Sequence, residues 1–409
     1  MFGTIRFIHS SDFHLDRPPR GLAEVPDHWR GPLIDAPYRA TTRVFDAAIK
    51  ERVDFVVLAG DLVDPALAGP RGLVFLGEQF RRLADEHIAV YWALGRSDRF
   101  GQWVDAWRLP AGVVRFEQDR VARVVHTRGG VPIAQILGTS AAERRRVRLS
   151  GFQTEDNELF AVAVAHGAAD AEVLSRHPAD YWALGGEHQR RAVLGGPVIA
   201  SYCGSPQGRK PQESGPHGCT LVHVDEERRV RASFLPTDAV RYLDERVEIG
   251  ETTTVEQLQL VLDERAAELC GDPFGPDMLI RWTITGSRML AAELRRGKLA
   301  ADLLARLRAA HGTRRPAIWS VSIEPAGAGE TAAIDADEPS LLGEFLRTVR
   351  HYAENLDEPL DFERYLSERH LAGSLAQALA IDEPALRRRV LDEVARLGSE
   401  LLCPQEPRP

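Results

Sequence analysis

The chain has 409 residues, of which 44% are hydrophobic, and this length predicts two or three domains with substantial cores. Its formal net charge of −9 excludes a protein whose whole surface is basic for nucleic acid, although a local basic groove remains compatible with it. Four widely separated cysteines without a Cys-x-x-Cys motif exclude a zinc ribbon and a disulfide framework. No apolar stretch approaches the ~20 residues that span a bilayer, and no signal-peptide pattern is present, so we expect a cytoplasmic protein without a membrane partner.

The first predicted element is a short buried strand over residues 5–8, and polar residues follow it directly. Asp12 and His14 stand at the carboxyl end of this strand, the edge where open α/β sheets bind ligands. On extended backbone, side chains two residues apart point the same way, so we expect the carboxylate and the imidazole to face one point. Both are ligands for Mn²⁺, Fe²⁺ or Zn²⁺. A polar loop after a strand is the alternative interpretation, because a lone Asp-x-His pattern is common.

Alternating strands and helices follow, which is the pattern of a mostly parallel sheet covered by helices. The segments expected are a Pro- and Gly-rich loop over 16–38, a helix over 40–52, a strand over 53–59, a helix over 71–86 and a strand over 88–94. Shorter strands are then expected over 113–116, 120–126, 131–137, 159–165, 180–184, 198–202, 219–225 and 230–235, the last three completing a second sheet. The predicted fold class is α/β, a two-sheet β-sandwich flanked by helices.

Residue types that bind metals or transfer protons recur at the predicted ends of these strands. They are Asp61, Asp98, His166 and His188, in addition to Asp12 and His14. A single histidine at a strand end is more often a core or capping residue than a ligand. Several Asp and His side chains at one sheet edge favour a metal site, because the carboxyl ends of parallel strands lie together.

The order of these motifs is Asp-x-His, Gly-Asp-x-x-Asp, Gly-x-x-Asp, His-Gly and Gly-x-x-His, and it resembles the calcineurin-like metallophosphoesterase superfamily. Residues 9–18 (HSSDFHLDRP) and 202–205 (YCGS) look like the SbcD/YhaO-type branch of bacterial DNA repair exonucleases. The long loop that contains Gly21 and Leu22 resembles the YhaO type. The resemblance covers residues 5–235.

The resemblance implies a centre with two divalent metals, for which Mn²⁺ is the expected cofactor. The two metals of the family share a bridging aspartate, which corresponds here to Asp61. The implied ligands of the first metal are all present: Asp12, His14, Asp61 and His188. For the second metal, only Asp61 and His166 match the family pattern.

Three positions depart from the family pattern, all on the side of the second metal. Arg96 stands in place of an asparagine ligand, Ser97 in place of the catalytic histidine, and Gly186 in place of a metal-site histidine. A serine cannot act as a general acid near neutral pH, and losing such a group typically costs ~10²–10⁴-fold in rate. Our hypothesis is that the Arg96 guanidinium takes the charge position of the missing ion and binds a phosphate; drift at an inactive site is the alternative. The predicted catalytic residues are His166, Arg96 and Asp98.

A metallophosphoesterase domain over 1–236 is followed by a predicted α+β domain over 240–325, which the resemblance implies caps the active site and helps to hold DNA. Its expected elements are strands over 242–248, 278–285 and 317–323 and helices over 254–269 and 291–311. A helical region over 338–403 comes after a linker. In the resembled family this region binds the coiled coil of an SMC-like ATPase; a helical cap on its own domain is the alternative.

These observations predict a metal-dependent DNA repair exonuclease subunit that acts with an SMC-like ATPase; a homodimer is expected from the family alone. The intact set of first-metal ligands supports this function. The incomplete second set supports the alternative, a catalytically impaired or inactive relative that serves as a DNA-binding or scaffold subunit of that ATPase. A small-molecule phosphoesterase is a third hypothesis, and the additional domains argue against it.

Overall fold

The computed structural model describes residues 3–22, 24–98, 107–118, 120–141, 146–147, 149–154, 158–196, 198–326, 340–355 and 384–402. The chain forms two compact units, Met1–Pro325 and Ala326–Pro409, and each is described by itself. Among the described helices, none is both long and apolar enough to cross a lipid bilayer.

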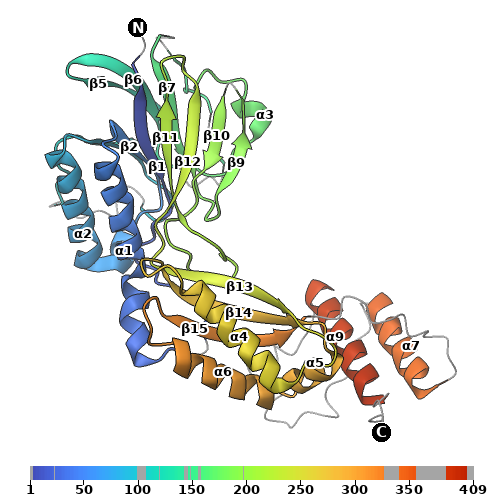
Figure 1. Cartoon of the computed structure of the whole chain (residues 1–409). Coiled ribbons are helices and arrows are strands. Elements are labelled where there is room, and N and C mark those ends of the chain that lie inside the picture. Colours follow the sequence, from blue (N-terminus) through green and yellow to red (C-terminus); the bar gives the residue numbers. More distant parts are fainter. Residues whose placement is uncertain are drawn as a thin grey trace. The chain divides into compact units, whose positions relative to one another are not determined.

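Six strands form the first sheet of the larger unit (Figure 1). In sheet order they are β12 (Val230–Pro236), β11 (Gly218–Val224), β1 (Ile5–Ser10), β2 (Phe55–Ala59), β3 (Ala89–Ala93) and β4 (Val113–Arg115). Strands β1 to β4 run parallel, whereas β11 pairs antiparallel with β1. Strand β2 is buried along its whole length, which is typical of a central parallel strand covered on both faces.

The second sheet also has six strands. In order they are β5 (Ala122–Arg128), β6 (Val131–Gly138), β7 (Phe160–His166), β8 (Tyr181–Gly185), β10 (Ile199–Tyr202) and β9 (Arg191–Leu194). The prediction that strands over 219–225 and 230–235 complete this sheet is wrong, because these segments are β11 and β12 of the first sheet. A hydrophobic pattern indicates that a segment is a strand but does not specify its partner, and β11 pairs with the distant β1.

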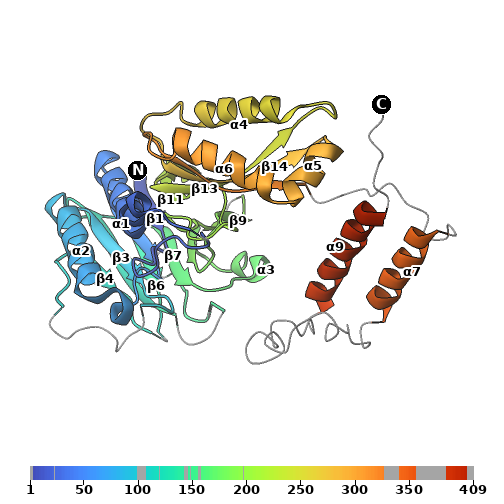
Figure 2. The ribbon, with the colours of Figure 1, turned by 90° about the horizontal axis from the view of Figure 1, so that it is seen from below.

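Three apolar layers stabilise this sandwich and confirm the predicted fold class. Between the sheets, Phe7, Phe55 and Val57 pack against Ile136 and Val162 of the second sheet. Helices α1 (Asp27–Lys50) and α2 (Pro65–Asp85) cover the outer face of the first sheet, and α3 (Ala171–Leu174) lies on the outer face of the second. Figure 2 shows α1 and α2 on one side of the two sheets and α3 on the other.

Helix α1 contradicts the loop predicted over 16–38 and begins well before the helix predicted over 40–52. The prediction rested on the Pro- and Gly-rich composition of the segment, which includes Pro32 and Pro37. A proline inside a helix removes an amide donor and costs roughly 3 kcal/mol or more. Both prolines nevertheless lie inside α1. The N-terminal half of the helix buries Trp29 and neighbouring apolar residues against the α+β part of the unit, and this burial offsets the cost.

The α+β part of the larger unit contains a third sheet of three parallel strands. They are β13 (Val240–Glu248), β14 (Asp277–Thr285) and β15 (Ile318–Pro325). Helices α4 (Val255–Leu269), α5 (Arg288–Arg295) and α6 (Lys298–His311) pack on one face around Trp282, and the N-terminal half of α1 packs on the other face. The helix predicted over 291–311 is divided at Gly297, whose φ of 86° lies in the left-handed region that favours glycine. Helix α1 therefore belongs to both the sandwich and this part.

The smaller unit contains helices α7 (Leu341–Glu354) and α9 (Pro384–Leu402), which pack against each other (Figure 1). Gly398 of α9 faces the ring of Phe345, and a Cβ added at this glycine would lie 2.1 Å from Phe345 Cε1. This close approach depends on the absence of a side chain at Gly398. Of the helical region predicted over 338–403, residues 338–339, 356–383 and 403 lie outside the described residues.

Replacing Trp29 by alanine should weaken the packing between α1 and the three-stranded sheet. Trp29 is 2% exposed, and its Nε1–H donates a hydrogen bond of 3.1 Å to Gly312 O. We expect W29A to lower the free energy of unfolding by about 3–5 kcal/mol, measured by urea denaturation. Ile34 lies on the same helix and is 50% exposed, so I34A is the control and should change stability by less than about 0.5 kcal/mol. Equal effects of the two variants would contradict a structural role for this contact.

Candidate metal centre

Four strands from the two sheets end at one edge of the sandwich: β1 and β2 from the first sheet, and β7 and β8 from the second. The sheets approach closely here, because a Cβ added at Gly185 would lie 1.8 Å from Ala59 O. A Cβ added at Gly95, after β3, would lie 2.2 Å from Asp61 Oδ1. Glycine at these two positions lets the segments that follow the strands bring their polar side chains together.

Asp12 and His14 enter the site from left-handed backbone and not from extended backbone. Their φ angles are 57° and 44°, so the prediction that they alternate along an extended strand is wrong. Such values cost of order 1–3 kcal/mol in residues other than glycine. Hydrogen bonds from Asp12 N–H to Gly60 O (2.8 Å) and from His14 N–H to Asp61 O (3.0 Å) hold the segment in this conformation. Both side chains nevertheless lie in the same site.

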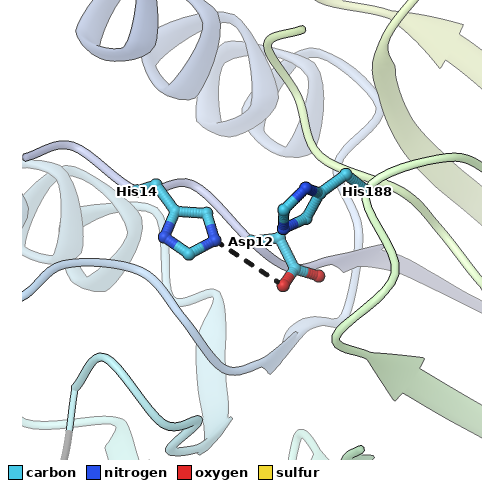
Figure 3. A group of neighbouring side chains, drawn as sticks. All are labelled: Asp12, His14 and His188. Carbon is cyan, nitrogen blue, oxygen red and sulfur yellow. Dashed lines mark ion pairs between the residues drawn. The ribbon is translucent and has the colours of Figure 1, made fainter. Parts of the chain in front are cut away.

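Asp12, His14 and His188 form a first group of side chains that could hold a metal ion, and Figure 3 shows them directed toward one another. Their ligand atoms lie within 4.8 Å of one another, and His14 Nε2 is 3.9 Å from Asp12 Oδ1. Asp12 Oδ2 accepts hydrogen bonds from the Ser11 hydroxyl (2.5 Å) and from Gly186 N–H (2.9 Å). These bonds orient the carboxylate and leave Oδ1 directed at His14.

Asp12 also belongs to a second group, with Asp61 and His166. Asp61 Oδ2 lies 3.7 Å from His166 Nε2 and 3.8 Å from His14 Nε2, which places this oxygen between two imidazoles. The other oxygen, Oδ1, accepts a hydrogen bond from Ser97 N–H (2.7 Å). His166 Nδ1 lies 2.8 Å from Ala59 O, and because a carbonyl oxygen only accepts, Nδ1 carries the proton and Nε2 faces the site.

Several buried atoms in these two groups have no hydrogen-bond partner. They are Asp12 Oδ1, His14 Nδ1, His14 Nε2 and His166 Nε2. Buried polar atoms in folded proteins are nearly always paired, so several of them at one place indicate a common partner. Carboxylate oxygens and imidazole nitrogens together suit a divalent transition-metal ion. The residues present therefore fit a divalent cation.

Burial and mutual proximity shift the pKa values of these groups. Burial raises the pKa of the Asp12 carboxyl and lowers that of His14, which the nearby Arg209 cation lowers further. Burial opposes ionisation of Asp61, but His166 and His14 hold the pKa of its carboxyl below the ordinary value. Burial lowers the pKa of His166, yet Asp61 and Asp12 outweigh it and raise that pKa. A metal ion binds neutral imidazole and ionised carboxylate, which are the forms that these shifts favour for His14 and Asp61.

Asp98 and Arg96, two of the predicted catalytic residues, are not members of either metal group. The buried Asp98 carboxylate accepts hydrogen bonds from the backbone N–H groups of Leu62 (3.0 Å), Asp61 (3.3 Å) and Gly95. Burial, together with the Asp61 charge, raises the pKa of Asp98 to about 7. Asp98 thus positions the segment that carries Asp61. The side chain of Arg96 is exposed, and its backbone N–H contributes to lowering the pKa of Asp61.

Gly186 occupies the position where the resemblance implies a histidine for the second metal. A Cβ added there would lie 3.3 Å from His166 Nε2, and the φ of 104° is left-handed. The neighbouring Glu187 carboxylate accepts two hydrogen bonds from Arg191, of 2.6 and 2.7 Å. This segment therefore adds no ligand to the second group among the described residues.

The loop over 204–217 supplies two residues that the sequence analysis does not single out. Glu213 Oε1 lies 2.8 Å from His188 Nδ1, and Arg209 Nη2 lies 2.9 and 3.0 Å from the two ring nitrogens of His188. Both side chains are buried. The only signal in the sequence is an arginine and a glutamate four positions apart in a Gly- and Pro-rich segment, a spacing without specificity. Only the folded loop shows that they reach a candidate ligand.

Residues 5–190 match a family model described as Calcineurin-like phosphoesterase. The chain is 30% identical over 239 residues to "Uncharacterized metallophosphoesterase YhaO" of Bacillus subtilis (strain 168), covering 55% of this chain and 58% of that protein. It is 28% identical over 251 residues to "DNA double-strand break repair protein Mre11" of Aeropyrum pernix (54% and 58%). It is 25% identical over 149 residues to a protein of the same name from Archaeoglobus fulgidus (33% and 32%). The chain thus spans at most 58% of the length of these relatives.

Adding Mn²⁺ should raise the unfolding temperature of the chain, because an ion that binds only the folded state stabilises it by about 2.7 kcal/mol at 100 times its Kd. We expect D61N to lose most of this increase, since Asp61 Oδ2 lies between His14 and His166. Differential scanning calorimetry measures the shift. The control is E187Q, which removes an exposed carboxylate paired with Arg191 and should keep the full increase. The metal assignment fails if Mn²⁺ leaves the wild type unchanged or stabilises D61N equally.

Proposed function

Residues 5–190 form a calcineurin-like metallophosphoesterase domain, and from this premise we propose that the chain is a metal-dependent phosphodiesterase that acts as a DNA exonuclease subunit. The observation that carries the proposal is the convergence of buried carboxylates and imidazoles with unpaired ligand atoms at one edge of the sandwich. The similarity to proteins named for DNA double-strand break repair supports DNA as the substrate.

The proposed ligands of the first metal are Asp12, His14, Asp61 and His188, and Mn²⁺ is the proposed ion. When bound, such an ion polarises a phosphoryl oxygen and lowers the pKa of a coordinated water. The chain's own residues orient the ligands: Ser11 holds the Asp12 carboxylate, and Ala59 O fixes the tautomer of His166. His166 therefore directs Nε2 into the site, where it is available either to the second metal or to the scissile phosphate.

Arg96 and Asp98 have different proposed roles in this reaction. The exposed Arg96 guanidinium contacts a phosphate of the substrate, because it follows β3 at the edge where the ligands converge. Asp98 acts through the backbone N–H groups of Asp61 and Leu62 and is a positioning residue. In a structure with Mn²⁺ and a nucleotide bound, an Arg96 side chain turned away from the phosphate would contradict its role.

A catalytically impaired scaffold is the second candidate function, and one observation favours it. Gly186 and Ser97 provide neither the ligand nor the general acid that the family pattern places there, and Glu187 is paired with Arg191. A second ion held by few ligands would bind weakly. In this alternative the chain keeps its fold to bind DNA and a partner.

Cleavage of linear DNA in the presence of Mn²⁺ discriminates between the two functions. If the chain is a nuclease, D61N should reduce the cleavage rate strongly, because the site loses a proposed ligand of the ion that polarises the phosphate. E187Q should cleave like the wild type. A wild type that binds DNA but cleaves none would favour the scaffold function and overturn the nuclease assignment.

We also propose that residues 240–325 cover the metal site and help to hold DNA. Residues 338–403 are proposed to bind an SMC-like coiled-coil ATPase in the cytoplasm. Helices α7 and α9 expose apolar side chains suited to packing against partner helices: Leu341 (70% exposed), Leu386 (42%) and Val394 (38%).

The free Cys203 and Cys219 thiols fit a reducing compartment. A homodimer is proposed from the family resemblance alone, and analytical ultracentrifugation that finds only monomer would contradict it.

Replacing both Leu386 and Val394 by glutamate should weaken binding to an SMC-like ATPase of the same organism by at least tenfold, which is about 1.4 kcal/mol. The physical reason is that charged side chains would be buried in an apolar interface. Surface plasmon resonance measures the affinity. The control is L67E, because Leu67 is 67% exposed on α2. Equal affinity for the wild type and the double variant would show that α9 is not the binding surface.

A further inference from the structure

The loop over 204–217, between β10 and β11, brings a buried cation to a candidate metal ligand. The Arg209 side chain is 10% exposed, and its Nη2 lies 2.9 Å from Nδ1 and 3.0 Å from Nε2 of His188. Glu213 Oε1 lies 2.8 Å from the same Nδ1 and 3.9 Å from Arg209 Nη2. Neither Arg209 nor Glu213 has a role in the function proposed above.

Hydrogen-bond chemistry fixes which ring nitrogen of His188 carries the proton. A carboxylate only accepts, so Nδ1–H donates to Glu213. A guanidinium only donates, so of its two contacts with the ring (2.9 Å to Nδ1 and 3.0 Å to Nε2) only the one to the lone pair on Nε2 can be a hydrogen bond. Figure 3 shows the His188 ring turned toward Asp12 and His14, so a metal at this site would use that same lone pair. Arg209 and a metal ion therefore compete for His188.

A metal ion at His188 would displace the Arg209 guanidinium from the ring, whereas the Arg209 backbone has its own hydrogen bonds. Arg209 N–H donates a hydrogen bond of 2.8 Å to Glu213 Oε2, and Arg209 O accepts one of 2.8 Å from Arg20 N–H. The displaced guanidinium would keep its positive charge with only the longer ion pair of 3.9 Å to Glu213, and a closer acceptor would stabilise this buried charge. Its Nε is already buried without a hydrogen-bond partner.

We propose that this acceptor is a phosphate, so that Arg209 binds the non-bridging oxygens of a substrate phosphate at the first metal. The inference rests on the proposed phosphodiesterase function and names a substrate-binding residue for it. The planar guanidinium fork matches two phosphate oxygens. Arg209 thereby supplies positive charge to the phosphate in a centre where Gly186 and Ser97 leave the second metal with few ligands. The metal and Arg209 compete in the free protein and act together once phosphate is bound.

Isothermal titration of Mn²⁺ into the full chain, with and without inorganic phosphate, tests this proposal. In the wild type, phosphate should raise the Mn²⁺ affinity by a factor in the range ~5–150, as for typical coupling between two ligands. In R209M, Mn²⁺ should bind more tightly than in the wild type without phosphate, and phosphate should raise the Mn²⁺ affinity by a clearly smaller factor than in the wild type. The control is R191M, which removes an exposed arginine paired with Glu187 and should behave like the wild type. A phosphate effect that is as large in R209M as in the wild type, or that the wild type lacks, overturns the proposal.

A second variant and a second assay keep the test decisive. R209Q retains a polar side chain at the buried position and replaces R209M if that variant does not fold. The results that would support or overturn the proposal are the same for both variants. DNA cleavage separates this proposal from the proposed function. Phosphate coupling that R209M clearly reduces, in a chain that never cleaves DNA, supports the Arg209 assignment and overturns the nuclease. Cleavage by the wild type with phosphate coupling intact in R209M overturns the Arg209 assignment alone.

Discussion

The metal centre depends on the close backbone approach of the two sheets at Ala59 and Gly185. The carbonyl oxygen of Ala59 accepts the hydrogen bond from His166 Nδ1–H and occupies the space that a side chain at Gly185 would need. One carbonyl group thus limits the separation of the sheets and orients an imidazole. Within the first sheet, backbone hydrogen bonds of Asp12 and His14 join their segment to the one that follows β2. The ligand geometry is therefore set by main-chain atoms of rigid elements, which is how precise sites are held.

Two connections make the α+β part of the larger unit a neighbour of this centre. Helix α1 contributes to the cores of both the sandwich and the three-stranded sheet. The loop that carries Arg209 and Glu213 is held by Gln207, whose side-chain oxygen accepts a hydrogen bond of 2.9 Å from Ala239 N–H at the start of β13. Gly215 N–H in the same loop donates to Tyr242 O at 2.8 Å. The residues around His188 are thus supported from outside the sandwich.

The sequence was sufficient for the fold class and for recognising metal-ligand residue types at strand ends. It placed them at the edge of one sheet, whereas His166 and His188 come from the second sheet and meet Asp12 and Asp61 only through the packing of the two sheets. It could not show that α1 continues through Pro32 and Pro37, since the compensating burial of Trp29 is a tertiary contact. Strand patterning likewise carried no information on the partner of β11. Arg209 and Glu213 lie in a segment without periodicity, so only the folded loop relates them to His188.

The pairing of β1 has a consequence for synthesis of the chain. Phe7 of β1 pairs with Phe55 of β2, which is made soon afterwards, whereas Ile5 pairs with Val224 of β11, which is made much later. During translation the apolar β1 therefore has one edge without its native partner until β11 emerges. Unpaired apolar strand edges are sites of misassembly and are the kind of surface that chaperones cover. Among the described strands that have a neighbour on both edges, β1 therefore waits longest for its second neighbour, and it is also the strand that begins the ligand-bearing segment.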